Sequence, residues 1–84
     1  MLREVGPATL ELTRRNGAFY LNARVSMNGD SWETVAIFPP DVEEEARFQF
    51  ERIQTPNDLE DLVRAWTPEE VWESYQYFRR AYGF

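Results

Sequence analysis

Histidine, cysteine and lysine are all absent from this 84-residue chain. Without histidine and cysteine, the chain lacks the imidazole and thiolate ligands that hold most zinc and haem groups. The same absence removes the usual base and one usual nucleophile of acyl transfer, and without lysine no side chain can form a Schiff base. We therefore expect no metal and no cofactor, and a protein that binds rather than catalyses.

Carboxylates remain as the side chains able to act as a base near neutral pH. A carboxylate-only enzyme, working by glycoside hydrolysis or through bound Mg²⁺, is therefore a functional class that stays open. The four glycines are scattered, so no glycine-rich phosphate-binding loop can be written. Many of the acids lie in predicted first helical turns, where they already stabilise the helix dipole, and so small a domain offers little room for a cleft. We predict that the chain is not an enzyme.

Long hydrophobic runs are also missing. No segment approaches the ~18 consecutive apolar residues of a membrane span, and no apolar stretch of a signal peptide follows the first residues. We expect one domain over residues 1–84, in a cytoplasmic setting, without membrane contact. Its stability must come from apolar packing, to which an aromatic content of 15% contributes. Oligomerisation would also stabilise so small a core, and a homodimer stays open.

Residues 8–38 alternate between apolar and polar side chains and predict a three-stranded antiparallel meander. Asn16-Gly17 is a strong hairpin signal, because a type I′ turn needs positive φ at both central residues, and Asn28-Gly29-Asp30 supplies a second turn. Residues 31–38 are apolar on both faces, since Val35 and Ile37 lie opposite Trp32, Ala36 and Phe38. That pattern predicts a central strand, or one covered on both sides.

The second half of the chain is predicted to be helical. Three segments place a capping residue three positions before an acid, beginning at Asp41, Thr55 and Thr67. Two apolar stripes at helical spacing follow, formed by Leu59, Leu62, Val63 and Trp66, and by Val71, Tyr75, Phe78 and Tyr82.

The segment before these stripes is ambiguous. Three observations favour a helix: residues 42–53 have an apolar face at helical spacing, Asp41 can cap it, and Glu43 can pair with Arg47 one turn on. Against this, residues 46–53 alternate between apolar and polar side chains, as a fourth strand would. We favour the helix. The fold class is α+β: a meander, with a fourth strand at 46–53 as the alternative, followed by two or three helices packed on one face.

Charge is distributed unevenly along the chain. Residues 1–40 carry four acids and four arginines, whereas residues 41–73 carry eleven acids and three arginines. Such a surface repels a phosphate backbone, so direct binding of nucleic acid is not expected. It attracts a basic protein surface instead. Solvation and helix capping alone are the plain alternative explanation of these acids.

These observations lead to two functional hypotheses. The sharper one is a small acidic inhibitor that occupies the basic, nucleic-acid-binding surface of a partner protein, as many anti-restriction and anti-CRISPR proteins of phages do; the analogy rests on size and charge alone. The alternative is an assembly or immunity-type protein that binds through exposed aromatics. The candidate acids are Glu43, Glu44, Glu45, Asp58, Glu60, Asp61, Glu69, Glu70 and Glu73. The candidate aromatics are Tyr20, Tyr77 and the terminal Phe84.

Overall fold

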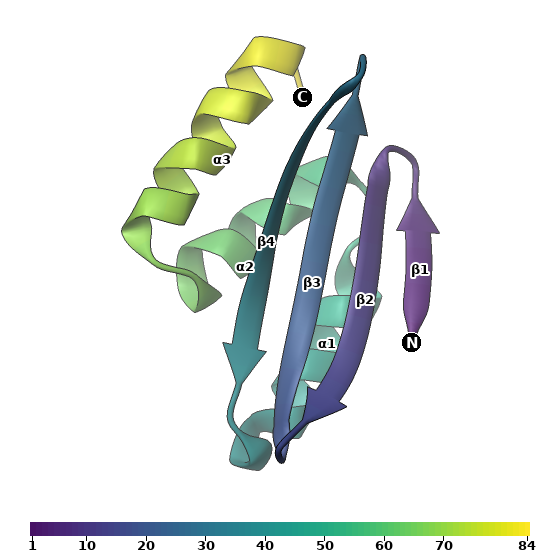
Figure 1. The fold of residues 1–84 in the computed structure, drawn as a ribbon, viewed down its shortest axis with the longest axis vertical. Helices are drawn as coiled ribbons and strands as arrows, with labels where there is room; N and C mark the ends of the chain where they lie inside the picture. The colour runs from purple at the N-terminus through teal and green to yellow at the C-terminus, as the bar shows by residue number, and fades with distance from the viewer.

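The computed structural model describes residues 1–84 and contains one antiparallel sheet followed by three helices (Figure 1). The strands are β1 (Leu2–Val5), β2 (Ala8–Arg15), β3 (Ala18–Met27) and β4 (Asp30–Phe38), and they lie in the sheet in that order. The helices are α1 (Glu43–Arg52), α2 (Leu59–Trp66) and α3 (Glu69–Tyr82). The predicted α+β class is confirmed.

Both predicted hairpin turns are present. Asn16 and Asn28 each have φ of 52°, and the glycine after each has φ of 83°. Positive φ at both positions defines a type I′ turn, whose twist matches that of the flanking strands. The turns fix the register, so that Leu12 pairs with Leu21 and Val25 with Trp32. The meander over residues 8–38 is confirmed.

The fourth strand is β1, which no pattern in the sequence had indicated. Residues 46–53, the proposed alternative for that strand, lie in α1 and the residue after it. The segment forms a helix and not a strand because a helix buries Ala46, Phe50 and Ile53 almost completely, while Phe48 on the other side remains 57% exposed. β1 has only four residues, too short for alternation to be recognised.

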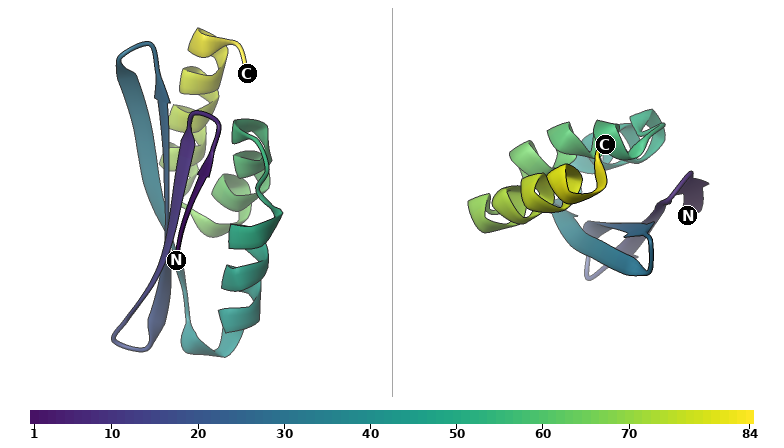
Figure 2. Two further views of the ribbon diagram at one scale, coloured as in Figure 1. Left: turned by 90° about the vertical axis from the view of Figure 1, so that its right-hand side faces the viewer. Right: turned by 90° about the horizontal axis from the view of Figure 1, so that it is seen from above.

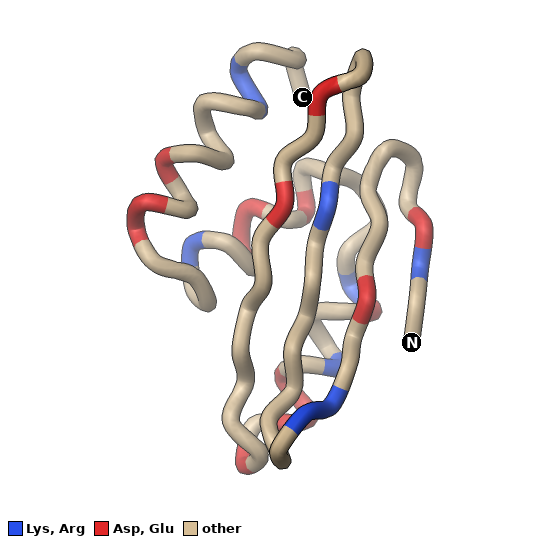
Figure 3. The backbone as a smooth tube through the Cα atoms, viewed as in Figure 1, with Lys and Arg blue, Asp and Glu red and all other residues tan.

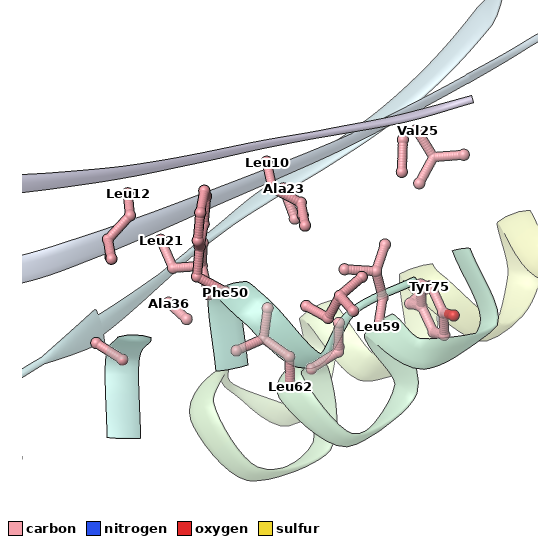
Figure 4. Packing of buried hydrophobic residues seen from close by; sticks show 14 of the residues in the cluster. Leu10, Leu12, Leu21, Ala23, Val25, Ala36, Phe50, Leu59, Leu62 and Tyr75 are labelled. Carbon is pink, nitrogen blue, oxygen red and sulfur yellow. The ribbon is translucent and has the colours of Figure 1, made fainter. Parts of the chain in front are cut away.

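All three helices pack on one face of the sheet and leave the other face uncovered (Figure 2). Eighteen buried residues form one continuous core between the two layers. Figure 4 shows Leu10, Leu21 and Val25 of the sheet directed towards Phe50 of α1, Leu62 of α2 and their neighbours. Both predicted apolar stripes lie on the buried side of their helices.

β4 is an edge strand, so the prediction of a central or doubly covered strand is wrong. Trp32, Ala36 and Phe38 face the helices and are buried. Val35 and Ile37 face the uncovered side and remain 39% and 52% exposed. The apolar side chains on the second face of β4 are therefore exposed, and no second layer covers them.

Two of the three predicted helix caps are absent. α1 begins after a short 3₁₀ turn (Pro40–Val42), and the Asp41 side chain makes no capping hydrogen bond. The Thr67 hydroxyl donates backwards to the carbonyl of Val63, at 2.5 Å, and so closes the end of α2 instead of capping α3. All three segments have the same spacing between capping residue and acid. The path of the chain between neighbouring elements determines whether the side chain caps the helix that follows.

Candidate functional site

The nine candidate acids divide into those that hold the fold together and those that do not. Glu43 pairs with Arg47 at 2.9 Å, and Glu45 accepts a hydrogen bond from the Gln49 amide at 2.9 Å. Glu60 accepts one from Arg79 at 3.0 Å and also lies 3.6 Å from Arg64. Internal contacts therefore already account for these three acids.

Asp58 is a fourth acid with a structural role. Its carboxylate accepts the backbone N–H groups of Gln54, at 2.9 Å, and Thr55, at 3.1 Å. This confirms the predicted cap beginning at Thr55, which precedes a 3₁₀ turn (Pro56–Asp58) at the start of α2. The bond from the Gln54 N–H lowers the pKa of Asp58, with smaller contributions from Thr55 and Arg52, although partial burial opposes the change.

The acids at the start of α1 have basic neighbours. Glu43 lines a shallow hollow of about 190 Å³ together with Arg14 and Arg47. Glu44 has no ion pair of its own, but it lies beside Arg47 at the edge of a second hollow. In Figure 3 red and blue segments mingle at this lower end of the molecule. The local charge is therefore partly compensated.

The acids at the start of α3 have no ion-pair partner. Glu69, Glu70 and Glu73 are exposed, and none of them makes a hydrogen bond or an ion pair within the protein. Residues three and four apart lie on the same side of a helix, so these acids share one side with Tyr77 and Arg80. We call these five residues the α3 outer face. Asp61 of α2 is likewise exposed and unpaired.

The opposite side of α3 fixes this face in position. Tyr75 and Phe78 are buried in the core. The indole N–H of Trp32 donates to the Ser74 hydroxyl at 3.0 Å, which ties the helix to β4. The Tyr82 hydroxyl donates to the Asp30 carboxylate at 2.8 Å and ties its last turn to the β3–β4 hairpin. The α3 outer face is therefore held on a rigid element.

The three candidate aromatics lie in different parts of the structure and differ in exposure. Tyr77 is 77% exposed and belongs to the α3 outer face. Tyr20 lies half-buried on the uncovered side of the sheet, with the Arg15 guanidinium 5.7 Å from its ring centroid. Phe84 is folded back against the core, with ring centroids 6.3 Å from Tyr75 and 6.2 Å from Phe78. Of the three candidate aromatics, Phe84 is therefore the one that packs against the core of its own chain.

One feature of the site could have been read from the sequence. Glu69, Glu73, Tyr77 and Arg80 recur at intervals of four and three residues, which places them on one side of any helix over this segment. The position of Tyr20 on the uncovered face of the sheet needed the tertiary structure.

Comparison with protein-family models, curated proteins and solved structures found no match to this chain. None of the helices combines the length and the apolar character needed to cross a membrane. The chemistry of the surface is therefore what points to a function.

Proposed function

We propose that this chain is a non-catalytic protein-binding module whose α3 outer face docks on a basic, nucleic-acid-binding surface of a partner protein. The observation that carries the proposal is the set of three exposed, unpaired carboxylates beside a tyrosine that is 77% exposed. A small acidic inhibitor of the anti-restriction or anti-CRISPR kind would work in this way.

Arginine is the residue that such a face would recognise best. Guanidinium groups bind carboxylates in a bidentate manner and also stack on aromatic rings. Glu73 and Tyr77 are one helical turn apart, so one arginine-rich loop can contact both. Tyrosine and arginine are also the residues that dominate binding hot spots.

The spacing of the carboxylates supports competition with nucleic acid. Glu69 and Glu73 are separated by about 6 Å along the helix axis. Along each strand of DNA a phosphate recurs about every 3.4 Å of the helix axis. Both arrays therefore place acidic groups within reach of one cluster of arginines.

The proposal is tested by binding to a panel of purified restriction endonucleases and CRISPR effector complexes. A true partner should bind the chain in competition with DNA, and its affinity should fall as salt is raised, because exposed charges are screened. The triple variant Glu69→Gln, Glu70→Gln, Glu73→Gln should weaken binding by about tenfold or more, since each carboxylate contact contributes of order 1 kcal/mol.

A matched control separates local contact from net charge. The triple variant Glu4→Gln, Glu11→Gln, Glu33→Gln changes the net charge equally but alters exposed acids of the sheet. It should bind almost as tightly as the natural chain. Equal losses in both variants, or an affinity unaffected by high salt, would contradict docking through the α3 outer face.

Tyr77 distinguishes the alternative, an assembly or immunity-type protein that binds through aromatics. If Tyr77→Ala abolishes partner binding while the glutamine triple variant binds normally, the aromatic contact is primary and acidity serves solubility. Tyr20→Ala tests the other exposed candidate aromatic separately, because Tyr20 lies on the uncovered face of the sheet and not on α3. Under our proposal both Tyr77→Ala and the glutamine triple weaken binding.

A further inference from the structure

The outward edge of β4 has unpaired backbone groups that can be assigned residue by residue. The two-residue turn at Asn28-Gly29 makes Met27 and Asp30 a hydrogen-bonded pair, and such pairs recur at every second residue. The even-numbered residues of β4 therefore bond to β3. The odd-numbered residues direct N–H and C=O away from β3, towards the open edge. Nothing in the protein bonds to these groups at Glu33, Val35 or Ile37.

Both ends of this edge are closed. At the hairpin end, the Asp30 carboxylate accepts the N–H of Ser31 at 2.9 Å, while its other oxygen is held by Tyr82. At the other end Pro39 and Pro40 have no N–H to offer. In Figure 1, α3 runs beside the upper part of β4, and the end of α2 is drawn on the same side of the strand farther down, on the face that the helices cover. No strand pairs with this edge, and its unpaired backbone groups lie at residues 33–37.

The opposite edge of the sheet is protected in a different manner. β1 has only four residues, and two of them are the charged Arg3 and Glu4. Short strands and charged residues are the usual means by which edges avoid pairing with other chains. β4 has nine residues, and residues 33–37 carry two exposed β-branched apolar side chains and a single charge. The two edges therefore differ in their readiness to pair.

We propose that β4 pairs antiparallel with β4 of a second copy of this chain, about a two-fold axis at Val35. In this register Val35 lies opposite Val35 of the second copy, and Glu33 lies opposite Ile37. All three outward-directed residues of each chain then find partners, and the two sheets form one continuous eight-stranded sheet. The proposal does not depend on the function proposed for the α3 outer face.

Charge within the sheet does not oppose a second copy in this arrangement. Residues 1–40, which form the sheet, carry equal numbers of acids and arginines, so two sheets meet without net repulsion. The two copies of Glu33 are offset by four residues, about 13 Å along the strands. That separation exceeds the Debye length of about 8 Å at physiological salt. No like charges lie directly opposite each other.

A foreign peptide fits this edge less well. Domains that capture extended peptides select their side chains in pockets beside the accepting strand. The hollows of this protein lie elsewhere, and the one that includes Glu33 is bordered mainly by β2 and β3 on the uncovered sheet face. Neither Val35 nor Ile37 borders any hollow. The self-complementary register therefore makes a second copy the better occupant.

Lysine substitutions test the register, measured by sedimentation equilibrium over a wide range of protein concentration. The natural chain should form a dimer. Val35→Lys places two lysines directly opposite each other and should raise the dissociation constant by about tenfold or more, because facing like charges destabilise a strand pair. Ile37→Lys places each lysine opposite Glu33 and should leave the dimer intact. Phe48→Lys, at an exposed apolar residue of α1, is the control for charge.

Cysteine cross-linking tests the same register independently, since the natural chain has no cysteine. Facing residues of a hydrogen-bonded pair have Cα atoms about 5.5 Å apart, within the range that a disulfide spans. Mild oxidation should therefore link Val35→Cys chains into covalent dimers. Ile37→Cys chains should stay unlinked, because their sulfur atoms would be separated by about 13 Å.

A natural chain that remains monomeric at millimolar concentration would overturn the proposal. So would a dimer that Val35→Lys and Phe48→Lys affect equally, or one in which Ile37→Cys links as readily as Val35→Cys. Far-UV circular dichroism of each variant verifies the fold, and a variant that does not fold is replaced by Val35→Pro. That substitution removes an N–H that β3 does not use.

Discussion

Removing the hydroxyl of Tyr75 should both destabilise the protein and abolish one part of its alkaline unfolding. The Tyr75 side chain is completely buried, and its hydroxyl donates to the Pro56 carbonyl at 2.8 Å. This bond connects α3 to the 3₁₀ turn that precedes α2. The Tyr75→Phe variant keeps the ring and loses only the bond, so its effect reports on that contact alone.

Two magnitudes follow from this environment. The lost hydrogen bond should lower the free energy of unfolding by about 1 kcal/mol near neutral pH. For a domain of this size, that loss lowers the Tm by roughly 4–8 °C. Burial also raises the pKa of Tyr75 from 10.0 to about 12, with opposing and reinforcing contributions from nearby charges. Since one pKa unit corresponds to about 1.36 kcal/mol, complete ionisation costs the natural fold up to about 2.7 kcal/mol.

The direction of the pH effect follows from the raised pKa. The fold favours the neutral phenol of Tyr75. The stabilisation that depends on this neutral form is fully present below pH 10 and is lost as the pH rises through about 12. At pH 11 the loss is about 1.4 kcal/mol. Tyr75→Phe has no phenol to ionise there. The natural chain should therefore be the more stable protein at pH 8 and the less stable one above about pH 11.

Urea unfolding from pH 8 to pH 12, followed by far-UV circular dichroism, measures both effects. Tyr82→Phe is the control, because Tyr82 has a raised pKa through its hydrogen bond to Asp30 but lies at the surface. Equal pH slopes for the natural chain and Tyr75→Phe would refute the argument, as would a variant of unchanged stability at pH 8.

Further stability predictions follow from the core, the helix cap and a turn, each measured by urea unfolding. Leu62→Ala, at a completely buried residue, should cost about 2–5 kcal/mol, whereas Leu2→Ala, at a residue 64% exposed, should have little effect. Asp58→Ala should cost about 1 kcal/mol near neutral pH. Because the pKa of Asp58 is lowered in the fold, that difference should begin to shrink as the pH falls below the ordinary value of 3.8 and should be lost once the pH has fallen through the lowered pKa. Gly17→Ala should cost about 1 kcal/mol or more through its φ of 83°, and Gly17→Asn clearly less.

Much of the architecture could be predicted because the relevant signals are local. The Asn-Gly turns specify hairpins by backbone geometry, and the apolar stripes of α2 and α3 specify which side of each helix is buried. Glu43 pairs with Arg47, as their spacing within a helix indicates. These features depend on residues at most a few positions apart, so the sequence contains them directly.

The features that the sequence did not indicate depend on how neighbouring elements meet. β1 pairs with β2 through backbone hydrogen bonds, and its four residues are too few to show the alternation of apolar and polar side chains that would predict a strand. The Thr67 hydroxyl could either accept an N–H of α3 or donate to a carbonyl of α2, and the turn between the two helices directs it to the Val63 carbonyl. Phe84 turns inward because Gly83 adopts φ of 74° and the Arg79 side chain bonds to the last carbonyl.

The sequence by itself determined the character of the surface: eleven acids in residues 41–73, and no histidine, cysteine or lysine. Composition is a property of the chain and does not change on folding. The tertiary structure decided which acids remain free, because Glu43, Glu45, Asp58 and Glu60 found partners and those at the start of α3 did not. It also decided that β4 forms an edge, since strand order depends on which segments pack together and not on the residues of one strand.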